Sequence, residues 1–293
     1  MKRIDFLKFL ALTPLSIYSM KLNKLEQFSE HFSDSAKMPV LFLGHGSPMN
    51  AIEENEFVQG FRNLEKKIPR PNAIVVISAH WETKGTFVTA MQQPKTIHDF
   101  GGFPKELFDI QYPAPGNPEL AKIIQSSVKK TSIDLDQSWG LDHGTWSVVK
   151  HLYPKAYIPV IQISMDYTQS PKYHYELGKE LAFLRNKGVL IIGSGNLVHN
   201  LGKVAWVKIN ENFAFDWAIE ASEKIKHEIK SGNHSALINY NRLSKSMQLA
   251  VPTPEHYLPL LYTLSIQDKN DPIEIFNDKP LAGSLTMTSL KIG

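Results

Sequence analysis

The sequence predicts a single α/β domain in which helices cover a central, mostly parallel sheet. Short runs of continuous apolar residues indicate strands that are buried on both faces, and helical segments separate these runs. This alternation is typical of parallel strands joined by helical crossovers. The chain has 293 residues, of which 42% are hydrophobic and 21% charged, so one large hydrophobic core is expected.

The first half of the domain contains two expected strands and two expected helices. In order, these are a strand at 39–43, a helix at 54–68, a strand at 73–77, an irregular segment at 95–118 and a helix at 119–130. Phe57, Phe61 and Leu64 recur at helical spacing, which supports the first helix. The irregular segment is rich in Gly, Pro and aromatic residues, and so long a segment inside a domain is usually a functional loop.

The second half repeats the alternation and ends on a strand. The expected elements are a strand at 158–163, a helix at 173–186, a strand at 189–192, helices at 212–230 and 254–264, and a strand at 284–292. Trp217, Ala221 and Ile225 lie four residues apart, as on one face of a helix. Residues 284–292 alternate in polarity, which predicts a half-buried strand at the C-terminal edge of the sheet.

Residues 1–37 differ from the rest and are expected to form an N-terminal extension. Lys2 and Arg3 precede a short apolar run at 9–18, which resembles a secretory signal; the alternative is an amphipathic helix lying on the domain. The protein is therefore expected to be cytoplasmic or exported to a periplasm, depending on whether residues 1–20 act as a signal. No later segment approaches the roughly 20 apolar residues that a membrane span requires.

Charge and cysteine content exclude several classes of protein. The formal charge is only +3 with His neutral, and no clustered basic face is apparent, so no nucleic-acid partner is expected. The chain has no cysteine. Disulfide scaffolds, thiolate zinc sites, iron–sulfur clusters and Cys nucleophiles are therefore excluded. Any metal must be held by His, Asp or Glu.

Histidines gather where apolar strands are expected to end. His45, His80 and His199 each lie just beyond such a strand, and ligands of open α/β sheets bind at the carboxyl ends of the strands. His256 lies at an expected helix start, and His143 lies in a turn-forming loop. A single histidine in such a place usually caps or packs, so position alone leaves both packing and a shared metal site open.

The other histidines and the aromatic residues carry weaker predictions. His98, beside Asp99 in the Gly-rich segment, is either a substrate contact or an ordinary loop residue. Trp81, Trp146 and Phe100 could stack on an aromatic substrate or belong to the core. The remaining histidines are expected on the surface: His31, His151, His174, His227 and His234.

Known catalytic motifs of other kinds are missing. Residues 193–195 read Gly-Ser-Gly after a strand but lack the full dinucleotide fingerprint. The sequence contains neither a Gly-x-Ser-x-Gly elbow nor a Walker-type lysine loop.

Six short motifs, in one order along the chain, carry a family resemblance. They are Leu43-Gly-His-Gly-Ser-Pro-Met49, Ser78-Ala-His-Trp81, Ile97-His-Asp-Phe-Gly-Gly-Phe103, Asp142-His-Gly-Thr-Trp146, Gly195-Asn-Leu-Val-His-Asn-Leu201 and Pro254-Glu-His-Tyr-Leu-Pro259. Together they resemble the class III (LigB-type) extradiol ring-cleavage dioxygenases, in the 4,5-DOPA dioxygenase branch. The resemblance covers residues 38–293, which are expected to be the catalytic domain.

The resemblance implies a set of metal ligands. His45 and His80 correspond to two imidazole ligands, and the third comes from His256 or, as in the wider class, from a carboxylate, here Glu255. His199 is either a fourth ligand or the acid–base residue.

The resemblance also implies roles on the substrate side. His143 is expected to hydrogen-bond a substrate oxygen as a catalytic residue, and His98 and Asp99 to lie on the loop that covers the substrate. The reaction would insert both atoms of O₂ into a small aromatic diol, DOPA-like, with ring opening.

The expected cofactor is one divalent metal. Fe(II) would serve catalysis, and Zn(II) is expected in purified protein because nitrogen sites bind zinc more tightly than iron(II). The same histidines would also serve a zinc-dependent hydrolase or a non-catalytic metal-binding protein. The sequence predicts no particular oligomeric state.

Overall fold

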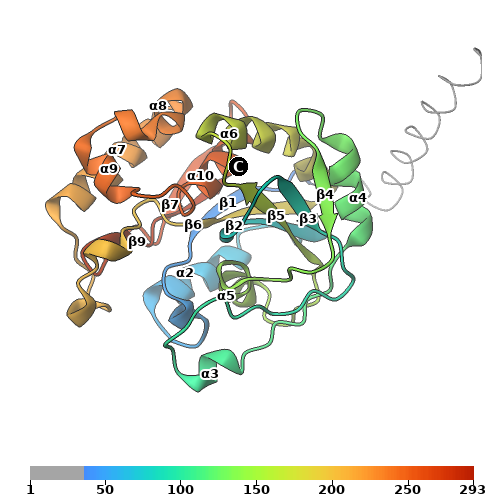
Figure 1. The fold of residues 1–293 in the computed structure, drawn as a ribbon, viewed down its shortest axis with the longest axis horizontal. Helices are drawn as coiled ribbons and strands as arrows, with labels where there is room; N and C mark the ends of the chain where they lie inside the picture. The colour runs from blue at the N-terminus through green and yellow to red at the C-terminus, as the bar shows by residue number, and fades with distance from the viewer. Residues whose placement is uncertain (1–35) are drawn as a thin grey trace, which may run out of the picture.

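An eight-stranded sheet organises residues 36–293, the part of the chain that the computed structural model describes (Figure 1). The strands lie in the order β4-β3-β5-β2-β6-β1-β10-β7. Their bounds are Val40–Gly44 (β1), Ala73–Thr83 (β2), Thr86–Thr89 (β3), Ile133–Asp136 (β4), Val160–Asp166 (β5), Val189–Gly195 (β6), Ile273–Phe276 (β7) and Ser289–Ile292 (β10). A separate two-stranded sheet pairs β8 (Pro280–Leu281) with β9 (Leu285–Thr286).

The centre of the sheet is parallel, as the sequence predicts. Strands β1, β6, β2 and β5 are parallel neighbours. Their residues face helices on both sides, which explains their continuous apolar sequences. Within β1, Val40 and Phe42 belong to one hydrophobic core, whereas Leu41 and Leu43 belong to the core on the opposite face.

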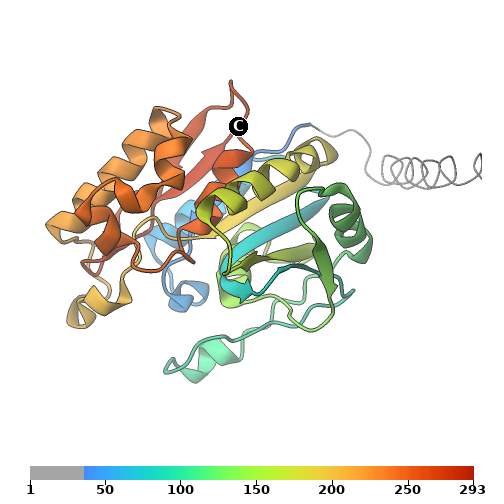
Figure 2. The ribbon, with the colours of Figure 1, turned by 45° about the horizontal axis from the view of Figure 1, so that its top comes forward.

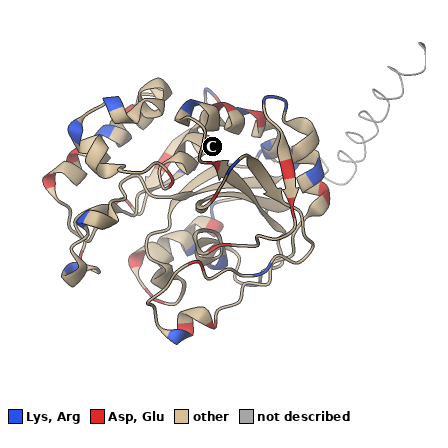
Figure 3. Cartoon of the chain, in the orientation of Figure 1, with Lys and Arg blue, Asp and Glu red and all other residues tan. Residues whose placement is uncertain are grey.

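Helices cover both faces of the sheet (Figure 2). One face packs against the 3-10 helix η1 (Pro48–Ala51) and helices α2 (Glu56–Glu65), α3 (Lys105–Phe108) and α5 (His143–Leu152). The other packs against α4 (Pro118–Ser127), α6 (Pro171–Glu180), α7 (Asp216–Lys230), α8 (His234–Ile238), α9 (Lys245–Ala250) and α10 (Leu258–Ser265). Further 3-10 turns are η2 (Ala182–Lys187), η3 (Leu201–Lys203), η4 (Trp206–Lys208) and η5 (Tyr240–Arg242). Basic and acidic residues are interspersed over the outer helices (Figure 3).

The C-terminal strand corrects one expectation. Strand β10 is not at the edge, because it pairs antiparallel with β1 on one side and with β7 on the other, so β7 is the edge. The alternating polarity of residues 284–292 suggested solvent on one face. Its serines and threonines are instead buried, and the Ser289 hydroxyl, for example, accepts a hydrogen bond from the Gly44 N–H at 3.0 Å.

Two histidines expected on the surface are buried. His151 is 7% exposed, and its Nε2 lies 2.7 Å from the Asn50 carbonyl oxygen. His174 is fully buried, with Nδ1 3.0 Å from the Tyr262 hydroxyl. Both imidazoles have hydrogen-bond partners from distant parts of the chain, which makes their burial possible. Their polar neighbours in the sequence gave no indication of this burial. His227 is exposed as expected, and His234 is half-buried beside Tyr175.

The expectations for residues 1–20 and for His31 lie outside the described residues. Within residues 36–293, no helix combines the length and the apolar character needed to cross a membrane.

Candidate active site

Three histidines meet at the carboxyl ends of the central parallel strands. His45 directly follows β1, and His80 lies in β2 just beyond its pairing with β6. His256 comes from the turn before α10. One nitrogen atom of each imidazole lies within 4.8 Å of the others. Strand topology thus brings residues that are far apart in sequence to one point, as the switch-point rule predicts.

Close backbone packing places His256 there. The Asn196 N–H, just past β6, donates to the His256 carbonyl oxygen at 2.9 Å. A Cβ atom on Gly195 would lie 2.1 Å from that same oxygen, so only glycine fits at the end of β6. The Gly195-Asn196 pair therefore holds the turn of His256 against the sheet.

The tautomer of His45 follows from its hydrogen-bond partner. The Ser194 hydroxyl donates its one proton to the Gly144 carbonyl oxygen at 2.5 Å. It must therefore accept from His45 Nδ1, which lies 3.0 Å away. His45 accordingly carries its proton on Nδ1 and presents an unprotonated Nε2 to the site.

Carboxylates determine the tautomers of the other two imidazoles in the same way. His80 Nδ1 lies 3.3 Å from Asp99 Oδ2, and His256 Nδ1 lies 3.1 Å from Glu255 Oε1. A carboxyl oxygen favours the proton on the ring nitrogen that faces it, so both histidines carry the proton on Nδ1. A metal-binding histidine typically donates a hydrogen bond from its other ring N–H to such a partner.

These donors fit a divalent cation. His45 Nε2 and His80 Nε2 lie 3.1 Å apart, and the tautomers above leave no proton between them. Two facing lone pairs repel unless a positive charge lies between or beside them. Imidazole nitrogens are ligands that suit iron(II) and zinc alike. The three histidines therefore have the right atoms, in the right protonation state, to bind one such metal.

Burial keeps these imidazoles neutral. The pKa of His80 falls to about 3, chiefly because burial penalises the charged form and secondarily because His143 is near. Burial likewise holds the pKa values of His45 and His256 well below their usual range, with neighbouring histidines adding to the effect.

Asp99 connects His80 to His143. Its Oδ2 accepts from His143 Nδ1 at 2.9 Å, and its Oδ1 accepts from the His143 backbone N–H at 2.8 Å. The rings of His80 and His143 are 3.8 Å apart between centroids. Despite burial, the hydrogen bonds from His143 lower the pKa of Asp99, so this carboxylate is ionised. His143 is thereby oriented with Nε2 free.

His143 is positioned by the start of α5. Asp142 caps this helix by accepting from the Thr145 N–H at 3.0 Å, and it also accepts from Ser78 and Gln162 at 2.7 and 2.6 Å. A Cβ on Gly144 would lie 2.8 Å from the His80 ring, so the glycine lets α5 approach β2 closely.

His199 lies beside the three histidines without joining their group. Its ring stacks on His256, with centroids 3.5 Å apart and planes inclined by 9°. The described residues give its imidazole nitrogens no hydrogen-bond partner. Burial lowers the pKa of His199 to about 4, so the ring is neutral at neutral pH and can accept a proton.

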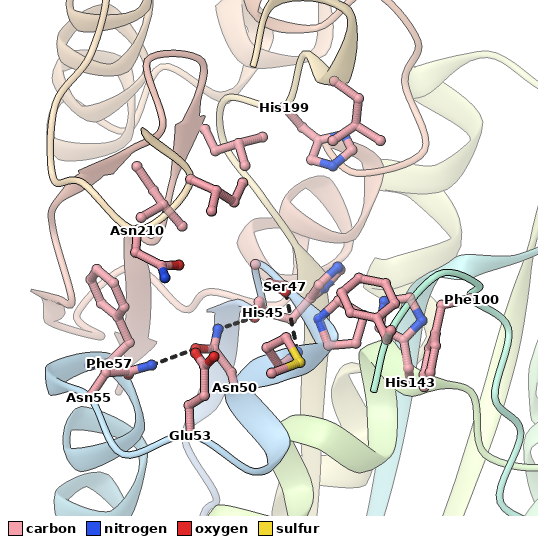
Figure 4. A pocket seen from close by; sticks show the side chains of 18 of the residues that line it. His45, Ser47, Asn50, Glu53, Asn55, Phe57, Phe100, His143, His199 and Asn210 are labelled. Carbon is pink, nitrogen blue, oxygen red and sulfur yellow. Dashed lines mark hydrogen bonds between the residues drawn. The ribbon is translucent and has the colours of Figure 1, made fainter. Parts of the chain in front are cut away.

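A cavity of about 880 Å³ opens from this cluster, with His45, His80, His143, His199 and His256 in its wall. In Figure 4, His143 lies beside Phe100 on one side of the cavity, and Glu53 and Asn55 lie on the other. Such a volume accommodates a small organic ligand.

Some predicted site residues lie elsewhere. His98 does not line the cavity: its Nε2 lies 3.0 Å from the Ile110 carbonyl oxygen, and its ring packs against Phe100 and Trp146. Asp99 faces the histidines and is also outside the cavity wall. Phe100 of the same loop does line the cavity. The three residues differ because adjacent side chains in an extended loop point in different directions.

Sequence reasoning missed Ser194 and Glu53. Ser194 lies at the end of β6, so the rule that ligands bind at the carboxyl ends of strands applies to it as it does to the histidines. The incomplete dinucleotide motif at residues 193–195 obscured this. Glu53 lies in the loop after η1, where no pattern marks it.

Comparison with known proteins agrees with this geometry. Residues 39–279 match the family model for the catalytic LigB subunit of aromatic ring-opening dioxygenase. A 4,5-DOPA dioxygenase extradiol of Escherichia coli K12 is 45% identical over 88% of this chain and 96% of its own length. That of Beta vulgaris is 35% identical over 85% of this chain and 94% of its own length.

A solved structure shows the same fold. The crystal structure of an uncharacterized protein from Escherichia coli K12 superposes with a TM-score of 0.76 at 41% identity, covering 87% of this chain and all of that one. The chain therefore belongs to the LigB family of aromatic ring-opening dioxygenases, and it is an extradiol ring-cleaving enzyme of that family.

Proposed function

We propose that this enzyme opens the ring of a catechol with a DOPA-like side chain, using iron(II) held by His45, His80 and His256. The observation that carries the proposal is the convergence of three neutral imidazoles, each of which has an oxygen atom of a neighbouring side chain within 3.3 Å of its Nδ1. The relatives named 4,5-DOPA dioxygenase extradiol support the substrate class.

The contact between Glu255 and His256 supports histidine as the third ligand. Glu255 Oε1 accepts from His256 Nδ1 and from the Thr253 hydroxyl, at 3.1 and 3.0 Å. This carboxylate therefore orients the imidazole and need not ligate the metal itself.

Bound iron(II) would supply the electron exchange with O₂ that protein side chains cannot provide. His199, neutral and free of partners, accepts the proton of a catechol hydroxyl and returns it later in the reaction. His143 holds its Nδ1 proton on Asp99, so its Nε2 is left to hydrogen-bond a substrate oxygen in the cavity.

The chemistry places both oxygen atoms in the product. The ring breaks beside the two hydroxyl groups, which gives a yellow product of the hydroxymuconic semialdehyde type. We also propose that purified protein carries zinc, because nitrogen sites favour zinc over iron(II).

Oxygen uptake tests the proposal. Protein loaded anaerobically with iron(II) is given a panel of catechols that includes DOPA, under an oxygen electrode, while a yellow product is followed by absorbance. Zinc-loaded protein and His45→Ala serve as controls. Uptake with colour, absent from both controls, is expected. No uptake on any catechol, with bound iron confirmed, would contradict the proposal and favour a zinc-dependent hydrolase.

A further inference from the structure

The end of the cavity away from the histidines is acidic. The wall contains Glu53, Glu54 and Glu56 and no lysine or arginine. A substrate side chain that extends from the histidines toward this end therefore meets net negative charge.

Two of the three carboxylates are already neutralised by basic side chains outside the cavity. Glu54 makes two hydrogen bonds with the Arg62 guanidinium, at 2.5 and 2.7 Å. Glu56 pairs with Lys279 at 2.5 Å and accepts from Asn212 at 2.7 Å. These two therefore have little remaining capacity to attract a ligand cation.

Glu53 differs from both. Its carboxylate has no ion pair and no hydrogen-bond partner among the described residues, and the side chain is only half-buried. Its place is fixed nevertheless, because its N–H donates to the Met49 carbonyl oxygen at 2.9 Å. Figure 4 shows Glu53 and Asn210 on opposite sides of the same space. A carboxylate in this position is a ready acceptor for an ammonium group.

The amides of Asn50 and Asn55 cannot take that role, because the Asn55 oxygen already accepts from two backbone N–H groups. Asn50 donates to the His45 carbonyl oxygen at 2.9 Å and accepts from Asn55 at 2.8 Å. These bonds fix Asn50 between the metal cluster and the outer cavity. Glu53 is thus left as the charged contact for a side chain.

We propose that Glu53 determines substrate specificity by binding the ammonium group of an amine-bearing catechol. The inference rests on the proposed function and narrows it. Catechols with a cationic side chain are favoured, zwitterionic amino acids such as DOPA are accepted, and catechols whose side chain carries only a carboxylate are disfavoured. The contact is remote from the reacting atoms, so it contributes equally to binding of substrate and transition state and acts mainly on KM.

Four substrates of one frame test this specificity. They are dopamine (cationic), DOPA (zwitterionic), 4-ethylcatechol (neutral) and 3-(3,4-dihydroxyphenyl)propionate (anionic), each with iron(II)-loaded protein. For the unaltered protein, we expect kcat/KM for dopamine to exceed that for the propionate by about tenfold or more. Glu53→Gln should lower kcat/KM for dopamine about tenfold, through KM, and leave 4-ethylcatechol nearly unchanged.

Two further variants complete the test. Glu65→Gln removes the same charge from an exposed position of α2 outside the cavity and should preserve all four values. Glu53→Lys should reverse the preference toward the propionate while 4-ethylcatechol is still cleaved, which also shows that the variant folds.

The outcomes separate the inference from the proposed function. Equal changes of Glu53→Gln on all four substrates, or a Glu53→Lys protein without reversed preference, would overturn the role of Glu53 while ring cleavage stands. Absence of cleavage of every substrate by unaltered, iron-loaded protein would instead overturn the proposed function and the inference with it.

Discussion

At the scale of single residues, the site depends on which ring nitrogen of each histidine carries the proton. Ser194 and Glu255 accept from Nδ1 atoms, and Asp99 lies 3.3 Å from Nδ1 of His80, so three Nε2 atoms are left as acceptors. Removing a residue that orients a metal ligand in this way commonly lowers metal affinity or activity about 10- to 100-fold.

Asp99→Asn should therefore lower kcat without unfolding the protein. An asparagine has only one acceptor oxygen, so it cannot accept from both the backbone N–H and Nδ1 of His143, and its lack of charge removes the attraction for Nδ1 of His80. We expect kcat on a catechol to fall about 10- to 100-fold, measured by oxygen uptake at equal iron content. Asp109→Asn, which alters an exposed carboxylate paired with Lys105, is the control. A kcat equal to that of the unaltered protein would show that Asp99 does not position the histidines.

The role of each residue in the site could be predicted from the sequence only in part. His45, His80 and His256 were identified from their motifs and from the ends of apolar strands. The acceptors that set their tautomers were not, because a serine or a carboxylate shows its function only through a distance to another segment. For the same reason the sequence left His98 open as a substrate contact or an ordinary loop residue, and its ring packs against Trp146.

At the scale of elements, the start of α5 determines where His143 lies. The sequence predicts a turn-forming loop around His143. The structure has a helix, since Asp142 caps it and is itself held by Ser78 and Gln162. Burial raises the pKa of Asp142, which makes these hydrogen bonds all the more necessary.

Asp142→Ala should destabilise the fold. It removes the helix cap and leaves the buried donors of Ser78 and Gln162 unpaired, with a combined cost of about 2–4 kcal/mol. Urea denaturation measures this free energy of unfolding. Asp216→Ala, at an exposed first turn of α7 without a side-chain cap, should cost far less. Equal effects of the two variants would refute the importance of this cap.

Strands were predictable in proportion to their burial. Strands β1, β2, β5 and β6 have helices on both faces and show continuous apolar runs. Strands β4 (Ile-Asp-Leu-Asp) and β7 (Ile-Glu-Ile-Phe) have only four residues each, so their alternation is too brief to predict a strand. The position of β10 inside the sheet depended on pairing with β1, which no local pattern encodes.

At the scale of the whole molecule, buried neutral histidines make stability depend on pH. Burial lowers the pKa of His174 to about 4 in the folded protein, against 6.5 in an unfolded chain. Between these values the unfolded state binds more protons, so the stability that is present above pH 6.5 is lost as the pH falls toward 4.

His174 alone should contribute roughly 2 kcal/mol of this loss between pH 7 and pH 5. Urea denaturation at pH 7, 6 and 5 measures it as the difference in pH dependence between the unaltered protein and His174→Gln. The exposed His227→Gln should leave the dependence unchanged. A His174→Gln protein with the full acid sensitivity would mean that other groups cause it.

The pairing of β1 also has a consequence for how the chain folds. β1 obtains its neighbours from residues 189–195 and 289–292, both more than a hundred residues away along the chain. Contacts between residues so distant in sequence form slowly, because closing the long loop costs conformational entropy before the contacts contribute any stabilisation. Until then β1 is an apolar strand with two open edges, which is a template for association with other chains. Refolding yield should therefore fall steeply as protein concentration rises.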